Sequence, residues 1–406
     1  MLADRFDHDH LWHPRISPVR ELAALKVARA DGATLTLADG RRLIDGDALG
    51  GAAILGYNHA VLNAALTGQL AAMAQAPFGG LTHVPAIELG QELLALTQER
   101  MAAVLYAVSE AQAMQAAQAM ARDWQRACGR SHRSTCVRVG SAEAEGLSAE
   151  AMTESMPLSD AVDESSALAH VDTWLDHHAD TLAAVQAAPL GIDGHRRSPR
   201  FLAELARLCH ARDVLLIDDE TGPGLARTDT PLAGVGDTMA PDIVCVGQAV
   251  TGACLPFAAT LASREVADAI GAPAAGRGSP YGATGMANPL ACAVALAVLG
   301  QVAGDAWAAR VAHVGEALAQ QLAPLAGLLQ VADIRVTGAM ATLELVAPIR
   351  LDTVRWRMLE VGLWLRPRGR FIHVTPPLVI DDADLARLCA GMQRLVSGIG
   401  REDLIL

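Results

Sequence analysis

Lysine is nearly absent from this sequence. Of the 32 Lys and Arg residues in the chain, Lys26 is the one lysine, and all the others are arginine. Chemistry that needs a lysine amine, such as imine formation with a carbonyl compound, would therefore depend on one residue near the N-terminus. Apolar residues are plentiful at 51%, so the chain can bury a large core, and its length of 406 residues favours two domains.

Positive charge and paired cysteines are also in short supply. The net charge is −13 and no basic run occurs, which argues against a nucleic-acid partner held through its phosphates. The seven cysteines are scattered and never form a CxxC pair. This distribution is typical of reduced, buried thiols and argues against a disulfide framework or a zinc site, so we expect no metal.

Neither a secretory signal nor a membrane span is indicated. The N-terminus, MLADRFDHDH, is acidic and has no apolar segment, so we expect a cytoplasmic protein. Residues 279–304 carry no formal charge, but Asn288 and Pro289 interrupt them. The helical part is about fifteen residues, shorter than the ~20 needed to span a bilayer, so a buried core helix is predicted.

The middle of the chain has the pattern of a parallel sheet covered by helices. Ser198-Pro199 predicts a helix start, and apolar residues on one face follow it to Cys209. Two short apolar runs, at 214–217 and 243–246, are separated by about thirty residues. Such runs alternating with amphipathic helices indicate an α/β fold with a mostly parallel central sheet.

The two ends of the chain have a different pattern. "ATLTLADGRRLIDG" predicts a hairpin with its turn at Asp39-Gly40, and helical stretches are expected to dominate from there to Cys128. The last hundred residues predict helices at about 304–323 and from Asp381, with strands at 332–336 and 341–346. We therefore expect a large α/β domain at 50–295 and a smaller α+β domain that combines residues 1–49 with 296–406.

Polar residues at the ends of the two apolar runs mark the expected cleft. Asp219 follows the first run and Gln248 the second, and ligands bind beyond the carboxyl ends of parallel strands. A buried carboxylate needs a partner, so Asp219 is either functional or paired structurally. In the C-terminal part Arg366 could bind a carboxylate, whereas Arg368 and Arg370 are expected to form a solvated edge.

Five collinear stretches give the chain a family resemblance. They are "DGRRLIDG" with "GYNHAVLNAAL", "FGGLTHVPAIEL", "APDIVCVGQAVTG", "MANPLACA" and "LRPRGRFIHVTPP". With them the chain resembles the class III aminotransferases of PLP fold type I, most closely the diaminopelargonate (adenosylmethionine-8-amino-7-oxononanoate) aminotransferases of biotin synthesis. The resemblance implies a dimer with the site for PLP between its subunits.

Three positions match residues that the family uses. Asp219 falls where the family's aspartate pairs with the pyridinium nitrogen of PLP, which keeps the ring an electron sink. Arg366 falls on the arginine that binds the substrate carboxylate. Thr284 falls on the threonine that reaches the cofactor phosphate of the neighbouring subunit.

Other positions depart from the family. Gln248 stands where the family has its Schiff-base lysine, and a carboxamide nitrogen cannot form an imine. Glu110-Ala111 replace the Gly-Ser that binds the phosphate. The remaining departures are Ser141-Ala142 for the Tyr-His pair that stacks on the cofactor, Ala188 for a strand-end glutamate, Gly50 and Gly51 for two substrate-wall tryptophans, and Arg15 for a tyrosine.

These departures together predict a degenerate aminotransferase that holds no covalent PLP. We expect a homodimer, with a heterodimer containing an intact aminotransferase as the alternative, and a non-catalytic role as a partner subunit or small-ligand-binding protein. Two alternatives remain: a PLP-independent enzyme that uses Asp219, Glu110 and Glu143 as acid–base groups, and a conventional biotin-pathway aminotransferase.

Overall fold

The large part of the molecule is built on a seven-stranded sheet. The computed structural model describes residues 6–7, 9–13, 24–140, 153–157, 163–191, 193–222, 225–228, 230–234, 239–271, 281–282 and 284–405. The strands lie in the order β4 (Met101–Ala107), β10 (Ala258–Ser263), β9 (Ile243–Val246), β8 (Leu215–Glu220), β7 (Leu182–Ala187), β5 (Thr135–Gly140) and β6 (Thr153–Pro157). β10 runs antiparallel to both of its neighbours, and the other neighbouring pairs are parallel.

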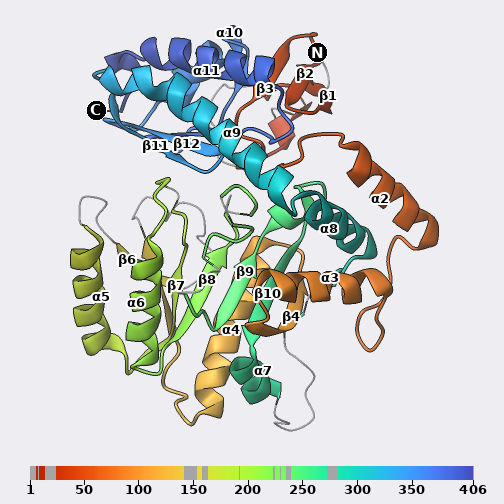
Figure 1. Cartoon of the computed structure of the whole chain (residues 1–406), viewed down its shortest axis with the longest axis vertical. Coiled ribbons are helices and arrows are strands. Elements are labelled where there is room, and N and C mark those ends of the chain that lie inside the picture. The colour runs from red at the N-terminus through yellow and green to blue at the C-terminus, as the bar shows by residue number, and fades with distance from the viewer. Residues whose placement is uncertain are drawn as a thin grey trace.

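Helices cover both faces of this sheet (Figure 1). One face packs against α4 (Glu110–Ala127) and α7 (Arg264–Gly271). The other face packs against α5 (Glu164–His178), α6 (Pro199–His210), α3 (Val84–Leu96) and α8 (Pro289–Gln301), and α2 (Ala60–Ala72) packs on α8. The predicted α/β class with a mostly parallel sheet is confirmed.

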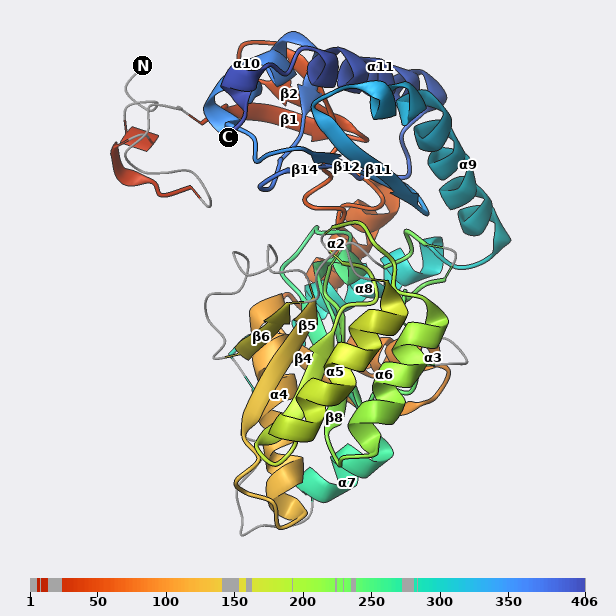
Figure 2. The same cartoon turned by 90° about the vertical axis from the view of Figure 1, so that its left-hand side faces the viewer.

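A smaller α+β part contains two further sheets. The first has the order β1 (Val27–Asp31), β2 (Thr34–Leu37), β3 (Arg42–Asp45) and β13 (Leu363–Trp364), and the second β11 (Val331–Thr337), β12 (Met340–Leu345) and β14 (Phe371–Val374). The helices are α9 (Asp305–Leu322), α10 (Leu351–Glu360) and α11 (Asp382–Ser397), with short 3-10 helices η2 (Gln248–Thr251), η3 (Ala323–Gly327) and η4 (Arg401–Asp403). Figure 2 shows this part stacked on the carboxyl ends of the large sheet. We propose that it corresponds to residues 1–49 and 296–406.

Several local predictions are confirmed. The hairpin is β2–β3, and Gly40 has the positive φ of 88° that its turn needs. α6 begins after Ser198, whose Oγ accepts a hydrogen bond from the backbone N–H of Phe201 at 3.1 Å. β9 spans residues 243–246 as predicted, and β8 extends past Ile217 to Glu220.

The prediction that helical stretches dominate up to Cys128 is confirmed by α2, α3 and α4. The strand β4, which lies between α3 and α4, was not predicted. Its sequence, MAAVLYA, contains strong helix formers, but pairing with β10 along its whole length outweighs their preference. Across the described residues no one helix is long and apolar enough to cross a bilayer, although α8 and the following helix, bent by 78°, pass that test as a pair.

Candidate functional site

The candidate site lies where β7, β8 and β9 end. Asp219, near the end of β8, accepts hydrogen bonds from Gln186 Nε2 at 2.8 Å and from Thr221 Oγ1 at 2.6 Å. Gln186 lies on the neighbouring strand β7 and is buried. The chain therefore supplies Asp219 with partners of its own, as a half-buried carboxylate requires.

Gln248 and Glu110 meet at this end of the sheet. Gln248 opens η2 one residue after β9 ends, and its backbone N–H donates to Glu110 Oε1 at 3.3 Å. Glu110 is the first residue of α4, a position where the helix dipole favours a negative charge. The Glu110 carboxylate can lie this close to the strand end because residue 247 is glycine: a Cβ there would lie 2.6 Å from Glu110 Oε1. The sequence therefore places a carboxylate against the strand end by means of a glycine.

The carboxyl group of Glu110 holds its proton more tightly than usual. Burial raises the pKa of Glu110, and the charge of Asp219 raises it further. The N–H of Gln248 and the charge of Arg368 act in the opposite direction. Because Glu110 and Asp219 are close enough to repel, this corner of the site favours a bound proton or cation.

Two further acids at the end of β8 were missed by the sequence analysis. Asp218 and Glu220 are buried and alternate with Asp219, so they point to the opposite face of the sheet. Burial raises the pKa of Glu220 to about 7 and that of Asp218 well above its ordinary value. Neither oxygen of Asp218 has a hydrogen-bond partner among the described residues. Three consecutive acids after an apolar run were the signal in the sequence.

Arg366 is paired within the chain. Its Nε lies 2.6 Å from Asp47 Oδ2, which also accepts from the backbone N–H of Gly50 at 2.8 Å. Gly50 has φ = 70°, and a Cβ there would lie 3.2 Å from Arg368 Nη2 and 3.4 Å from Arg366 Nη2. Glycine at this position thus leaves room for two guanidinium groups at the domain boundary.

Arg368 does not form the solvated edge that we predicted. Burial raises the pKa of Glu110, and the charge of Arg368 counteracts this rise. Burial, and after it the charge of Arg368, lowers the pKa of His373 to about 4. Arg370 is also not simply solvated, because its Nε lies 3.4 Å from Glu344 Oε1. The prediction was wrong because it assumed an isolated strand edge, whereas Arg368 lies next to Gly50 and Arg370 next to Glu344 of β12.

A buried arginine anchors the second glycine. Arg227 is fully buried, and its Nε donates to the carbonyl of Gly51 at 2.6 Å while its Nη1 donates to that of Pro376 at 2.9 Å. These bonds tie the Gly50–Gly51 loop to the segment after β14. Sequence reasoning missed Arg227, because nothing in the pattern distinguishes it from a surface arginine.

The remaining predicted residues are dispersed. Thr284 is exposed, and the next residue, Gly285, would place a Cβ 3.9 Å from Val108, just before α4. Ala111 is exposed in the first turn of α4. Arg15, Ser141, Ala142 and Glu143 lie outside the described residues.

Lys26 lies beside a different sheet from Asp219 and Gln248. It is exposed, its carbonyl accepts from Ala38 N–H at 2.8 Å, and it directly precedes the edge strand β1 of the small sheet. Over the residues that the structure covers, no three His, Cys, Asp or Glu side chains are grouped to hold a metal ion.

Comparisons with known proteins agree with this architecture. The family described as Aminotransferase class-III matches residues 16–143 and 144–396. Adenosylmethionine-8-amino-7-oxononanoate aminotransferase of Mycobacterium leprae is 34% identical over 97% of this chain and 96% of its own length, and that of Corynebacterium glutamicum is 33% identical over 97% and 98%. An amine transaminase from an uncultivated Pseudomonas species, solved with PLP as the internal aldimine, superposes with a TM-score of 0.86 at 27% identity over 96% of this chain and 99% of that one.

Proposed function

The chain belongs to the class-III aminotransferase family, and we propose that it is a member that has kept the fold and lost the covalent chemistry of PLP. The single observation that carries this proposal is Gln248 at the end of β9, where we assign the family's Schiff-base lysine. A carboxamide nitrogen is not a nucleophile and forms no imine. Lys26 precedes the edge strand of a different sheet, so it is no substitute.

The surroundings of Gln248 do not fit the cofactor either. We assign the phosphate-binding end of α4 to Glu110 and Ala111, and the Glu110 carboxylate already accepts the Gln248 N–H. A phosphate next to an ionised Glu110 would cost about 4 kcal/mol per charge pair at 4 Å and intermediate dielectric. Asp219, our assignment for the pyridinium partner, is already bonded to Gln186 and Thr221. PLP therefore fits these described residues poorly.

A non-catalytic role follows as the first functional proposal. The cleft keeps acids on the large-domain side and the Arg366–Asp47 pair on the other, which suits a small polar ligand. The alternative of a PLP-independent enzyme rests on the raised pKa of Glu110 beside Asp219. The alternative of a conventional biotin-pathway aminotransferase rests on the names of the relatives and would require PLP to act without a lysine at Gln248.

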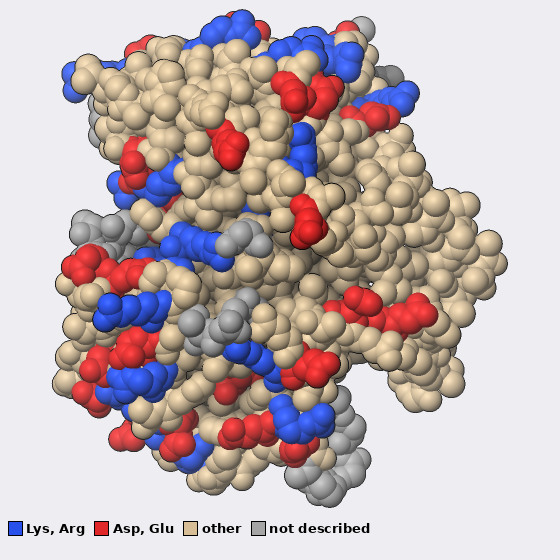
Figure 3. Space-filling view, viewed as in Figure 1, with Lys and Arg blue, Asp and Glu red and all other residues tan. Residues whose placement is uncertain are grey.

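The proposed dimer has support in the charge distribution. No Asp, Glu, Lys or Arg occurs from Ala48 to Ile87. α2 and the start of α3 expose apolar side chains within this stretch, namely Val61, Leu70, Met73, Leu81, Val84 and Ile87. In Figure 3 the right-hand lobe that carries α2 is tan over its outer part. An uncharged apolar surface of this kind is typical of a subunit interface.

Borohydride reduction tests the loss of covalent PLP directly. The purified protein is incubated with PLP, reduced and mapped by peptide mass spectrometry, with the Mycobacterium leprae relative treated identically as the positive control. We expect a pyridoxyl-lysine in the relative and none here, and no absorbance of an internal aldimine. Because the chain has a single lysine, a pyridoxyl group on Lys26 would be unambiguous and would overturn the proposal.

A further inference from the structure

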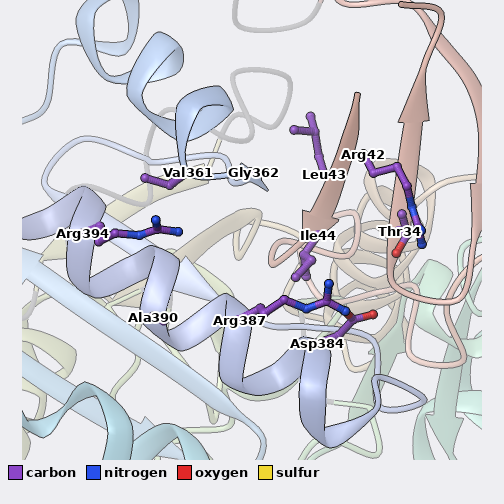
Figure 4. A pocket seen from close by; sticks show the side chains of 10 residues that line it. All are labelled: Thr34, Arg42, Leu43, Ile44, Val361, Gly362, Asp384, Arg387, Ala390 and Arg394. Carbon is purple, nitrogen blue, oxygen red and sulfur yellow. The ribbon is translucent and has the colours of Figure 1, made fainter. Parts of the chain in front are cut away.

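A groove in the small part of the molecule lies between the β1–β2–β3–β13 sheet and helix α11, and its volume is about 270 Å³. This is close to the lower end of the roughly 300–1,000 Å³ found for small-molecule sites. Figure 4 shows Arg387 and Arg394 on the helix side, Arg42 with Thr34 on the strand side, and Ile44 between them. The groove thus combines an apolar floor with three guanidinium groups.

The local sequence explains why these residues share one groove. Thr34 and Ile44 are partners across β2 and β3, and Arg42 lies two residues from Ile44, so the three point to the same face of the sheet. On α11 the positions Asp384, Arg387, Ala390 and Arg394 follow helical spacing and form one stripe. The other face of α11 is buried in the small-domain core.

The groove carries an excess of positive charge. Asp384 pairs with Arg387, and in the part of the chain that the structure describes neither Arg42 nor Arg394 has an ion-pair partner. All three arginines are exposed, so solvent screens part of the repulsion between them, and a bound anion would remove more of it. The excess of positive charge is unexpected in a chain with a net charge of −13.

We propose that this groove binds a small organic dianion whose apolar body rests on Ile44 and the neighbouring wall. Guanidinium groups on opposite sides bind carboxylate or phosphate oxygens by charge-assisted hydrogen bonds. Gly362, with φ = 76°, forms part of the wall without a side chain, and a Cβ there would lie 4.0 Å from the Arg42 carbonyl oxygen. This site is separate from the cleft that contains Glu110 and Asp219.

Titration calorimetry with two probes, glutarate and phenyl phosphate, tests the proposal. All measurements use the full chain with Arg366→Gln, so that binding of the probes to the cleft arginine does not contribute to the measured heat. We expect saturable binding of at least one probe, weakened at least about tenfold by Arg42→Gln with Arg394→Gln. Preference for glutarate identifies a dicarboxylate ligand, and preference for phenyl phosphate identifies a phosphate monoester.

Two further variants separate the groove from general charge effects. Ala390→Glu adds a carboxylate at an exposed position of the groove and should abolish binding without disturbing the core. Arg264→Gln removes an exposed arginine on α7 and should leave the affinity within about twofold. The proposal is overturned if neither probe binds saturably, or if the groove variants bind as tightly as the Arg264→Gln control.

Discussion

At the scale of single residues, Gln248 and Glu110 depend on each other. The Glu110 carboxylate accepts the N–H of Gln248, and Gly247 makes the approach possible. On our assignment, a lysine at position 248 would place an amine beside this carboxylate. Glu110 would still occupy the end of α4 to which we assign the cofactor phosphate.

We predict that Gln248→Lys alone does not restore transamination. The amine would be present, but Glu110 would still repel the cofactor phosphate by about 4 kcal/mol. Turnover of an amino donor with PLP is expected to stay at background in this variant. PLP affinity should rise about 100- to 1,000-fold when Glu110→Gln is added.

The single change Glu110→Gln, with Gln248 left in place, is the matched control, because it removes the same charge without supplying an amine. Appreciable turnover by Gln248→Lys as a single change would show that the other departures are harmless and that our assignment of them is wrong.

A second residue-scale prediction concerns Glu220, whose pKa is raised to about 7 by burial. The folded state then keeps a proton that the unfolded state releases from pH ~4.3 upward, so this group stabilises the fold at low pH. That contribution is lost as the pH rises through about 7. Glu220→Gln should remove this loss. The change in the free energy of unfolding between pH 5 and pH 8 should therefore be more favourable in the variant than in the wild type by roughly 2–3 kcal/mol.

Urea unfolding of both proteins at pH 5, 6, 7 and 8 measures the difference. Glu316→Gln, which removes an exposed carboxylate on α9, is the control and should follow the wild-type curve. Parallel curves for Glu220→Gln and wild type would contradict the assignment of this pH dependence to Glu220.

At the scale of elements, the start of α6 is secured by one side chain. Ser198 Oγ accepts from the Phe201 N–H, and the Ser198 N–H donates to Glu164 Oε1 at 2.7 Å, which also links α6 to α5. Ser198→Ala should lower the free energy of unfolding by about 1 kcal/mol. Ser165→Ala, an exposed change in the first turn of α5, should have a smaller effect in the same urea titration. Equal losses of unfolding free energy in the two variants would show that the Ser198 cap does not stabilise α6.

The elements differ in how far the sequence predicts them. β8, β9 and α6 were predictable because their apolar pattern and caps are local. β4 was not, since its alanines favour a helix and only pairing with β10 makes them a strand. The same holds for the site. Asp219 and Gln248 were predictable because they come at the ends of apolar runs. Arg227 and Arg368 were not, because their positions depend on how the two parts of the molecule pack together.

At the scale of the whole molecule, the uncharged surface of α2 and the start of α3 predicts the assembly state. Val84→Glu with Ile87→Glu places two charges on side chains that are 62% and 50% exposed in the single chain, so the subunit fold should tolerate them. If this surface is the interface, light scattering should change from dimer to monomer.

Leu329→Glu, a change at the most exposed large apolar residue of the small part, is the control and should remain dimeric. A monodisperse wild-type monomer at micromolar concentration would refute the dimer. Co-expression with an intact aminotransferase of the same organism tests the heterodimer, which is dropped if the two do not co-purify.

The pairing of β3 with β13 has a consequence for biosynthesis. Residues 42–45 leave the ribosome early, but their parallel partner at 363–364 follows roughly 300 residues later, or about 15–60 s at usual elongation rates. During that interval β3 has a free edge while the large sheet can already form. The nascent chain therefore presents an unpaired strand next to an uncharged apolar segment, and a chaperone that covers residues 42–87 until translation ends would raise its yield.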